Sequence, residues 1–413
     1  MPVGSFAEWL RQMPEAEVLS LLRRRPDLAL PAPATSTVLA TRAATRASVA
    51  RAAEELDAFT LAVTDALLLA KADHAEVGLQ PLAALLGPTV SGDALHAALA
   101  RLRELGLSWG TERAIRIVPT LREVSSPFPG GLGRSNPDLA RTDIAAALGT
   151  LDAGQRQLLE VLAAGPPIGT TRHAEQPDAP TTGLLRAGLL IRRDPQTVEL
   201  PREVGVALRG AFPMGEVPLR APELPIENPG ASIVDATAAG AAAQLSRHAE
   251  ALLRSMAANP SPVLRSGGIG VREVRRYARE LEVTEATAGL LLELLRAAGL
   301  IGAQEGAQPQ WVPTVAMDRW ALGSAAQRWA QLALAWLEMP RLAGLIGRPD
   351  GSGKTLGALT ESLESVQAPA ARRRTLQALR ELPSGSAPGD KDALAELLRW
   401  RRPRRSGGLH AQG

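Results

Sequence analysis

The feature that most constrains the fold of this chain is an internal repeat. Its three copies occupy residues 102–119, 185–201 and 295–313. Each copy reads as the Leu-Arg end of an amphipathic helix, then Gly-Leu, a short polar turn and a strand that closes on proline. Gly106, Gly188 and Gly299 precede the closing prolines by 13, 13 and 14 positions. This nearly constant spacing predicts one supersecondary unit used three times.

The order of elements within a copy predicts a winged helix. A glycine directly after a helix can adopt the left-handed conformation and end the helix, and two strands around a polar turn make a hairpin. In the third copy, residues 271–281 and 285–298 have helical periodicity, and Thr284 is the expected N-cap between them. The first copy is also well formed. In the second copy, prolines within 165–167 and 177–180 leave little room for a middle helix.

The expected fold class is therefore mainly α with small β-hairpins, arranged as tandem winged-helix (helix-turn-helix plus wing) repeats. Linkers rich in Pro, Gly and Ser at residues 125–137 and 213–229 are the best candidate boundaries. The expected domains are an N-terminal helical segment (1–57), winged-helix-like repeat 1 (58–124), a degenerate repeat 2 (138–212), repeat 3 (230–316), a C-terminal helical domain (320–402) and a disordered tail (403–413).

The composition removes several classes of function. The chain has no cysteine, which excludes disulfides and thiolate zinc sites and fits a reducing compartment. No two of its five histidines stand three or four residues apart, and it has no Gly-x-Ser-x-Gly motif. We therefore expect no metal, no cofactor and no catalysis. Because the sequence also lacks long apolar runs and an N-terminal signal segment, we expect no membrane partner and a cytoplasmic location, with nucleoid association as the alternative.

One glycine-rich loop keeps an enzymatic alternative open. Residues 347–355 read Gly-Arg-Pro-Asp-Gly-Ser-Gly-Lys-Thr, and a loop that ends in Gly-Lys-Thr can bind phosphate through its N–H groups and its lysine. The spacing departs from that motif, because Arg348 stands where the first glycine belongs and Gly347 comes one residue too early. A weak ATPase that uses the loop near Lys354 is the second alternative function.

Two groups of arginines are the candidate nucleic-acid contacts. The first is a basic stripe at helical spacing on residues 271–281, made by Arg272, Arg275, Arg276 and Arg279. The second surrounds an aromatic residue near the C-terminus and consists of Arg399, Arg401, Arg402, Arg404 and Arg405. Each has a plain alternative, a hydrated helix face or a basic disordered end. The presumed recognition helix at 285–298 has Arg296 as its only base and no Asn, Gln or Lys, so sequence-specific readout is not expected.

Several strings resemble those of a known family. They are Phe-Ala-Glu-Trp-Leu at 6–10, Leu-Leu-Arg-Arg-Arg-Pro-Asp at 21–27, Ala-Thr-Arg-Ala-Ser at 44–48, Leu-Asp-Ala-Phe at 56–59 and Gly-Gly-Ile-Gly-Val-Arg-Glu-Val at 267–274. The chain resembles actinobacterial helicase-associated proteins, whose domain is similar to the N-terminal domain of XPB-type helicases. The resemblance implies a tandem winged-helix protein of DNA repair or transcription. It also implies truncation at the C-terminus, since family members continue with further domains.

These observations favour a helicase-associated, DNA-binding accessory protein without catalysis on this chain. The expected partners are DNA, bound weakly or nonspecifically, and a helicase or a repair or transcription protein. The alternative is a protein-interaction scaffold of winged-helix repeats that never contacts DNA. Residues 399–413 hold five arginines and no acid, so the remainder of the chain carries a formal net charge of −2 against a total of +3. The basic character therefore belongs to the tail, and the DNA hypothesis rests on the helix stripe, the tail and the resemblance.

Overall fold

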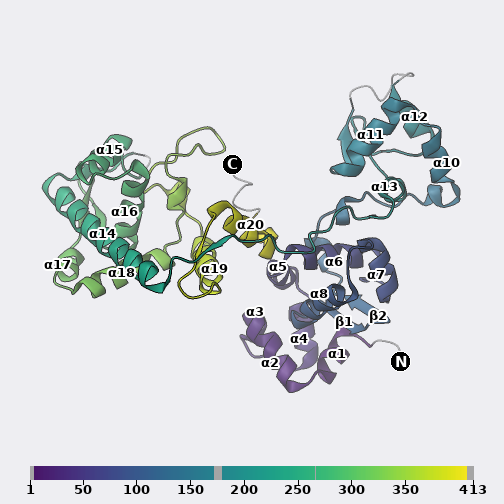
Figure 1. The fold of residues 1–413 in the computed structure, drawn as a ribbon, viewed down its shortest axis with the longest axis horizontal. Coiled ribbons are helices and arrows are strands. Elements are labelled where there is room, and N and C mark those ends of the chain that lie inside the picture. The colour runs from purple at the N-terminus through teal and green to yellow at the C-terminus, as the bar shows by residue number, and fades with distance from the viewer. Residues whose placement is uncertain (1–3, 172–178, 266, 407–413) are drawn as a thin grey trace. The chain divides into compact units, whose positions relative to one another are not determined.

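The computed structural model describes residues 4–171, 179–265 and 267–406 (Figure 1). The chain divides into two compact units. Unit 1 comprises Met1–Pro222 and Arg399–Arg405, and unit 2 comprises Glu223–Leu398 and Ser406–Gly413. The division between the two units falls within the linker predicted at residues 213–229.

Unit 1 begins with five short helices. They are α1 (Phe6–Gln12), α2 (Glu15–Arg24), α3 (Pro26–Ala29), α4 (Ser36–Ala43) and α5 (Arg46–Ala53). The capping box predicted from Ser5 and Glu8 is confirmed, because each side chain accepts a hydrogen bond from the other's backbone N–H. Leucines of α1 to α3 share a small core, whereas Val49 of α5 packs in the core of the following helices. By its packing, α5 therefore belongs with the first repeat, although the boundary was predicted at residue 57.

The first repeat follows the same order as its sequence pattern. Its elements are α6 (Ala58–Leu69), α7 (Leu79–Leu86), α8 (Gly92–Glu104), β1 (Ser108–Thr111) and β2 (Ala114–Ile117), and α9 (Leu121–Val124) comes next. The β1–β2 hairpin is antiparallel, and Val77, which precedes α7, pairs with Ile115 of β2. Asp57 accepts a hydrogen bond from the Thr60 N–H at 2.7 Å and so caps α6.

The second repeat combines short helices with a small sheet. It contains α10 (Ile144–Gly149), α11 (Ala153–Ala164), β3 (Ile168–Thr170), α12 (Pro180–Arg186), β4 (Ile191–Arg192), β5 (Thr197–Glu199) and α13 (Arg202–Arg209). Two 3₁₀ turns precede it, η1 (Pro129–Gly131) and η2 (Pro137–Arg141). Its strands form one sheet in the order β3-β5-β4. The predicted degeneracy concerns the stretch between β3 and α12, most of which (172–178) lies outside the described residues.

Unit 2 contains the third repeat. Its elements are β6 (Ile226–Glu227), α14 (Ala231–Ala258), β7 (Ser261–Pro262), α15 (Val271–Glu280), α16 (Glu285–Ala297), β8 (Ile301–Gln304) and β9 (Gln310–Pro313). The strands form a sheet in the order β7-β9-β8. Thr284 accepts a hydrogen bond from the Thr287 N–H at 3.1 Å, so the predicted N-cap of α16 is confirmed.

The rest of unit 2 follows this sheet, and the last helices carry the chain back to unit 1. The elements are α17 (Ala316–Ala321), α18 (Ala325–Glu338), η3 (Ala343–Leu345), η4 (Glu361–Leu363), α19 (Ala368–Arg380), β10 (Ala387–Pro388), α20 (Lys391–Arg401) and α21 (Pro403–Ser406). Helices α14, α16 and α18 pack against one another (Figure 1), with α16 at the centre of the core. Strand β10 pairs with β6.

The prediction of a mainly helical chain with small antiparallel hairpins is confirmed. The repeat glycines Gly106, Gly188 and Gly299 have φ values of 62°, 72° and 71°, so each ends its helix in the left-handed conformation as the sequence predicted. The short strands β3 and β7 and the isolated bridge at Val77, which precede the middle helices, were missed, because one to three residues give no detectable alternation. Within the described ranges, no helix combines the length and apolar character needed to cross a membrane.

Candidate nucleic-acid interface

The predicted basic stripe lies on α15, and one of its four arginines, Arg276, is partly buried among partners within the protein. Arg276 forms ion pairs with Glu273 at 2.8 Å and with Glu280 at 3.1 Å. Its guanidinium also donates to Ser261 Oγ at 3.2 Å and lies 4.2 Å from the centre of the Tyr277 ring. Burial alone would lower the pKa of Arg276, but the carboxylates that accept its hydrogen bonds raise it overall. Arg276 therefore joins α15 to the start of the sheet.

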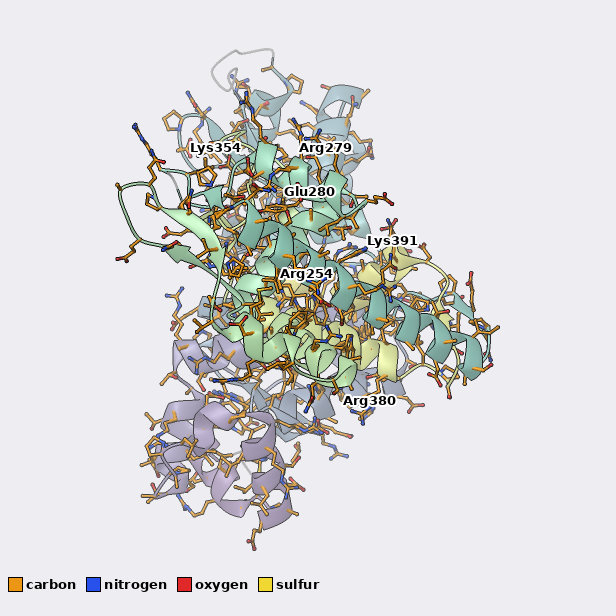
Figure 2. All side chains as sticks on the ribbon, turned by 90° about the vertical axis from the view of Figure 1, so that its left-hand side faces the viewer. Arg254, Arg279, Glu280, Lys354, Arg380 and Lys391 are labelled. Atoms are coloured by element: carbon orange, nitrogen blue, oxygen red, sulfur yellow. The ribbon has the colours of Figure 1, made fainter. Side chains whose placement is uncertain are left out.

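The other three arginines of the stripe are exposed. Arg275 pairs with Glu285 at 3.0 Å, at a site where both side chains are more than half exposed. The Arg279 Nε donates to the carbonyl oxygen of Arg275 at 3.3 Å, and Figure 2 labels Arg279 beside Glu280. Arg272 is exposed as well. Because exposed ion pairs are weak and exchange readily, these three cations remain able to contact an external anion.

The presumed recognition helix α16 is buried over its centre, whereas Glu285 and Ala286 at its start are exposed. The buried side chains on it are Ala288, Leu291, Leu292, Glu293, Leu294 and Leu295, and Gly289 is also buried. A helix that reads DNA must present one face to the major groove. Here Arg296, its single base, donates to the Leu359 carbonyl at 3.1 Å and stacks on Trp311. The centre of α16 therefore has no free face for a groove.

The chain itself covers α16 with residues 341–364, here called the covering segment. Glu293 is fully buried and forms an ion pair with Arg341 at 2.5 Å. The Leu359 N–H donates to the Glu293 carboxylate at 2.5 Å, and Arg341 also pairs with Glu364 at 3.0 Å. A Cβ built on Gly289 would lie 3.0 Å from Ile346 Cδ1, so a glycine is needed for this close approach. A buried ion pair and close packing thus hold the covering segment in place.

The second group of arginines lies on unit 1. The C-terminal arm, defined as Arg399–Arg405, belongs to that unit by its contacts. Arg402 forms an ion pair with Glu55, and Arg405 pairs with Glu55 at 2.7 Å and with Glu54 at 3.2 Å. Glu54 and Glu55, here called the acid pair, follow directly on α5. These arginines therefore neutralise carboxylates of the protein.

The remaining contacts of the arm are to backbone groups. Arg404 donates to the Val124 carbonyl oxygen at 3.0 Å and to Ser125 Oγ at 3.2 Å. Burial lowers the pKa of Arg404, although the nearby charge of Asp65 acts in the opposite direction. The indole Nε1 of Trp400 donates to the Pro218 carbonyl at 2.9 Å, and the ring packs beside the first repeat's core. Trp400 is therefore a packing anchor in this structure.

The predicted disordered tail needs a partial correction. Residues 403–406 form the short helix α21, and Arg404 and Arg405 are only partly exposed. The sequence interpretation failed here because the acid pair lies about 350 positions earlier in the chain. Residues 407–413 of the predicted tail lie outside the described residues. Arg399 is exposed and Arg401 is partly buried, and both remain predicted contacts.

In the glycine-rich loop, the carboxylate of Asp350 accepts hydrogen bonds from the loop's own N–H groups. The Asp350 carboxylate accepts from the N–H groups of Ser352 and Lys354, each at 2.9 Å, and from Ser352 Oγ at 2.7 Å. These hydrogen bonds lower the pKa of Asp350, with the Ser352 hydroxyl as the largest contribution. A phosphate would need the same N–H groups. The Lys354 side chain lies on this loop (Figure 2), which an aspartate already organises.

Two further charged pairs were missed by the sequence analysis. Glu293 and Arg341 are 48 positions apart, and Asp73 and Arg122 are 49 positions apart. In the second pair, Arg122 donates to both carboxylate oxygens of Asp73 and to the Leu68 carbonyl at 2.8 Å. The glutamate inside the Leu-rich run of α16 could have indicated the first pair, because a buried carboxylate needs a cationic partner.

Other site types receive no support in the part of the chain that the structure describes. No three His, Asp or Glu side chains there gather closely enough to hold a metal ion. Comparison with protein-family models, with curated proteins and with solved structures finds no match to this chain. The chemistry of the described residues is therefore the basis for a functional proposal.

Proposed function

We propose that this chain is a non-catalytic accessory protein of the helicase-associated kind, whose winged-helix-type repeats hold partner proteins and do not read DNA sequence. The third repeat has the order helix, strand, helix, helix, strand, strand, and the first has the same order with the bridge residue Val77 in place of its first strand. This order supports a winged-helix assignment. The observation that carries the proposal is the burial of α16 beneath the covering segment. A winged helix with a covered recognition helix has lost its means of base readout and retains its outer faces for protein contacts.

Exposed apolar side chains supply a surface for such contacts. Four large ones occur within twenty residues of unit 2, around and along α17 and α18: Val315, Leu322, Trp329 and Leu334. They are 91%, 90%, 44% and 63% exposed. Exposed apolar patches mark interaction sites, and tryptophan is among the residue types enriched at the energetic centres of protein interfaces.

Co-purification tests this proposal. The tagged full chain should retain a helicase, repair or transcription protein of the same cell, and Leu322→Ser/Leu334→Ser should release most of it. The matched control is Val161→Ser/Ile168→Ser, which changes two exposed apolar residues of unit 1. If both double variants retain the partner equally well, these residues of unit 2 do not form the binding surface. If the wild type retains no such protein, the scaffold proposal itself is wrong.

Direct, sequence-independent contact with DNA is a second candidate function. It is favoured by the exposure of Arg272, Arg275 and Arg279 on one face of α15. Each arginine that neutralises one phosphate contributes about 0.9 to the slope of log K against log salt, so a triple Ala variant should lose about 2.7 of that slope. The matched control is Arg23→Ala/Arg24→Ala/Arg46→Ala, three exposed arginines of unit 1. An unchanged slope in the α15 variant would remove this assignment.

A weak ATPase that uses the loop near Lys354 stays the second alternative function, and it is disfavoured because Asp350 occupies the N–H groups that a phosphate would need. Its test remains simple. Crosslinking of an ATP analogue to the full chain should be the same in wild type and in Lys354→Ala.

A further inference from the structure

The C-terminal arm is a cationic segment bound by carboxylates of its own unit. Its seven residues contain five arginines and no acid. Arg402 and Arg405 reach the acid pair, and Arg404 reaches the backbone at the end of α9. A segment of this composition is also a strong ligand for nucleic-acid phosphates, which arginine binds with the same forked geometry that it uses for carboxylates.

Local electrostatics explain why this place on unit 1 attracts cations. Glu54 is the C-cap of α5, so the acid pair stands at the negative end of a helix. The two carboxylates repel each other and the partial negative charge of the helix carbonyls. Cations bound there offset this repulsion. Asp65 lies near Arg404 and adds a further negative group. Burial raises the pKa of Asp65, and the charge of Arg404 acts against this rise by favouring the ionised carboxylate. Glu54, Asp65 and Arg404 line a cleft with a volume of about 580 Å³.

The contacts of the arm are suited to exchange. The side chains of Arg402, Arg405, Glu54 and Glu55 are between 23% and 36% exposed. Ion pairs at this exposure are screened by salt and contribute little individually. A polyanion can replace the carboxylates as the partners of Arg402 and Arg405. Both arginines follow Trp400 in the chain, so they can move while the indole ring stays packed beside the core.

We propose that the acid pair and nucleic-acid phosphates compete for the C-terminal arm. While the arm is docked, Arg402, Arg404 and Arg405 are withheld from nucleic acid. Once a polyanion captures the arm, the three arginines bind phosphates and the acid pair is freed. The arm binds the acid pair or nucleic-acid phosphates whether or not the repeats hold a partner protein, so the competition does not depend on the scaffold function.

Binding of the full chain to a short labelled DNA duplex, measured over a range of salt concentrations, tests the competition. In Glu54→Gln/Glu55→Gln the arm loses its carboxylate partners and should be free to bind DNA. Three additional phosphate contacts steepen the slope of log K against log salt by about 2.7. A fourfold rise in salt then weakens DNA binding about 40-fold more than in wild type. Adding Arg402→Ala, Arg404→Ala and Arg405→Ala should abolish the gain.

Two further measurements separate arm release from a general change in charge. Glu160→Gln/Glu216→Gln makes the same charge change at two exposed residues of unit 1 and should leave DNA binding as in wild type. Trypsin should cut the arm faster in the acid-pair variant, as read by intact mass. If the double variant does not fold, Glu55→Gln alone removes a partner of both Arg402 and Arg405. Faster arm cleavage without tighter DNA binding would overturn the competition, and unchanged cleavage would overturn the docking.

Discussion

The ion pair beneath the covering segment gives the sharpest test of this structure. Glu293 is 0% exposed and the Arg341 side chain is 6% exposed. In Glu293→Gln, the amide oxygen can still accept the Leu359 N–H, but the Arg341 charge stays buried without its main counter-charge. Removal of one partner from a buried ion pair costs about 3–5 kcal/mol. Because Arg341 keeps Glu364 and a backbone carbonyl, the lower end, about 3 kcal/mol, is expected.

Urea unfolding of the full chain, followed by circular dichroism, measures this loss. With a urea m-value of about 2 kcal/mol/M, the midpoint of the transition that involves unit 2 should fall by about 1.5 M. Arg341→Met in the Glu293→Gln background removes the stranded cation, so the double variant should be more stable than Glu293→Gln alone. A double-mutant cycle should give a coupling of about 2 kcal/mol between the two residues.

An exposed ion pair in the same unit is the matched control. Glu338 and Arg373 pair while their side chains are 61% and 51% exposed. Glu338→Gln should cost less than about 1 kcal/mol, because solvent screens such pairs. If Glu293→Gln lost no more stability than Glu338→Gln, the argument that α16 is clamped by a buried charge would be refuted, and the scaffold proposal would lose its carrying observation.

Three further predictions concern other residues. Arg25 is 2% exposed and donates to the Leu105 carbonyl at 3.0 Å, so Arg25→Met should lower the stability of unit 1 by about 2–4 kcal/mol; an unchanged thermal midpoint would contradict this. Burial alone would raise the pKa of Asp73, but the hydrogen bonds and charge of Arg122 lower it on balance. Because the pKa of Asp73 is lower in the folded state, its ionised form stabilises the fold fully at neutral pH. This stabilisation is lost as the pH falls through the acid range below about 4. The difference in stability between wild type and Asp73→Asn should therefore close in acid and not in base. For Asp350→Ala, loss of the carboxylate that organises residues 350–354 should raise the rate of proteolysis in this loop; an unchanged rate would show that the loop does not depend on it.

The sequence by itself determined the local structure of this protein. The helix starts at Ser5 and Thr284 depend on one side chain and an N–H three residues later. The helix ends at the repeat glycines depend on the freedom of glycine to take a positive φ. These are short-range effects, so their signals stand within a few positions of one another.

The tertiary structure alone decided what the charged residues do. In sequence, the arginines of the C-terminal arm looked like free cations, yet distant carboxylates bind Arg402 and Arg405. Likewise, the sequence indicated α16 as a recognition helix, but not that Arg341 and Leu359 of a distant segment cover it. An ion pair depends on distance in space, and partners tens or hundreds of positions apart leave no local pattern, so only the folded chain could show which charges meet.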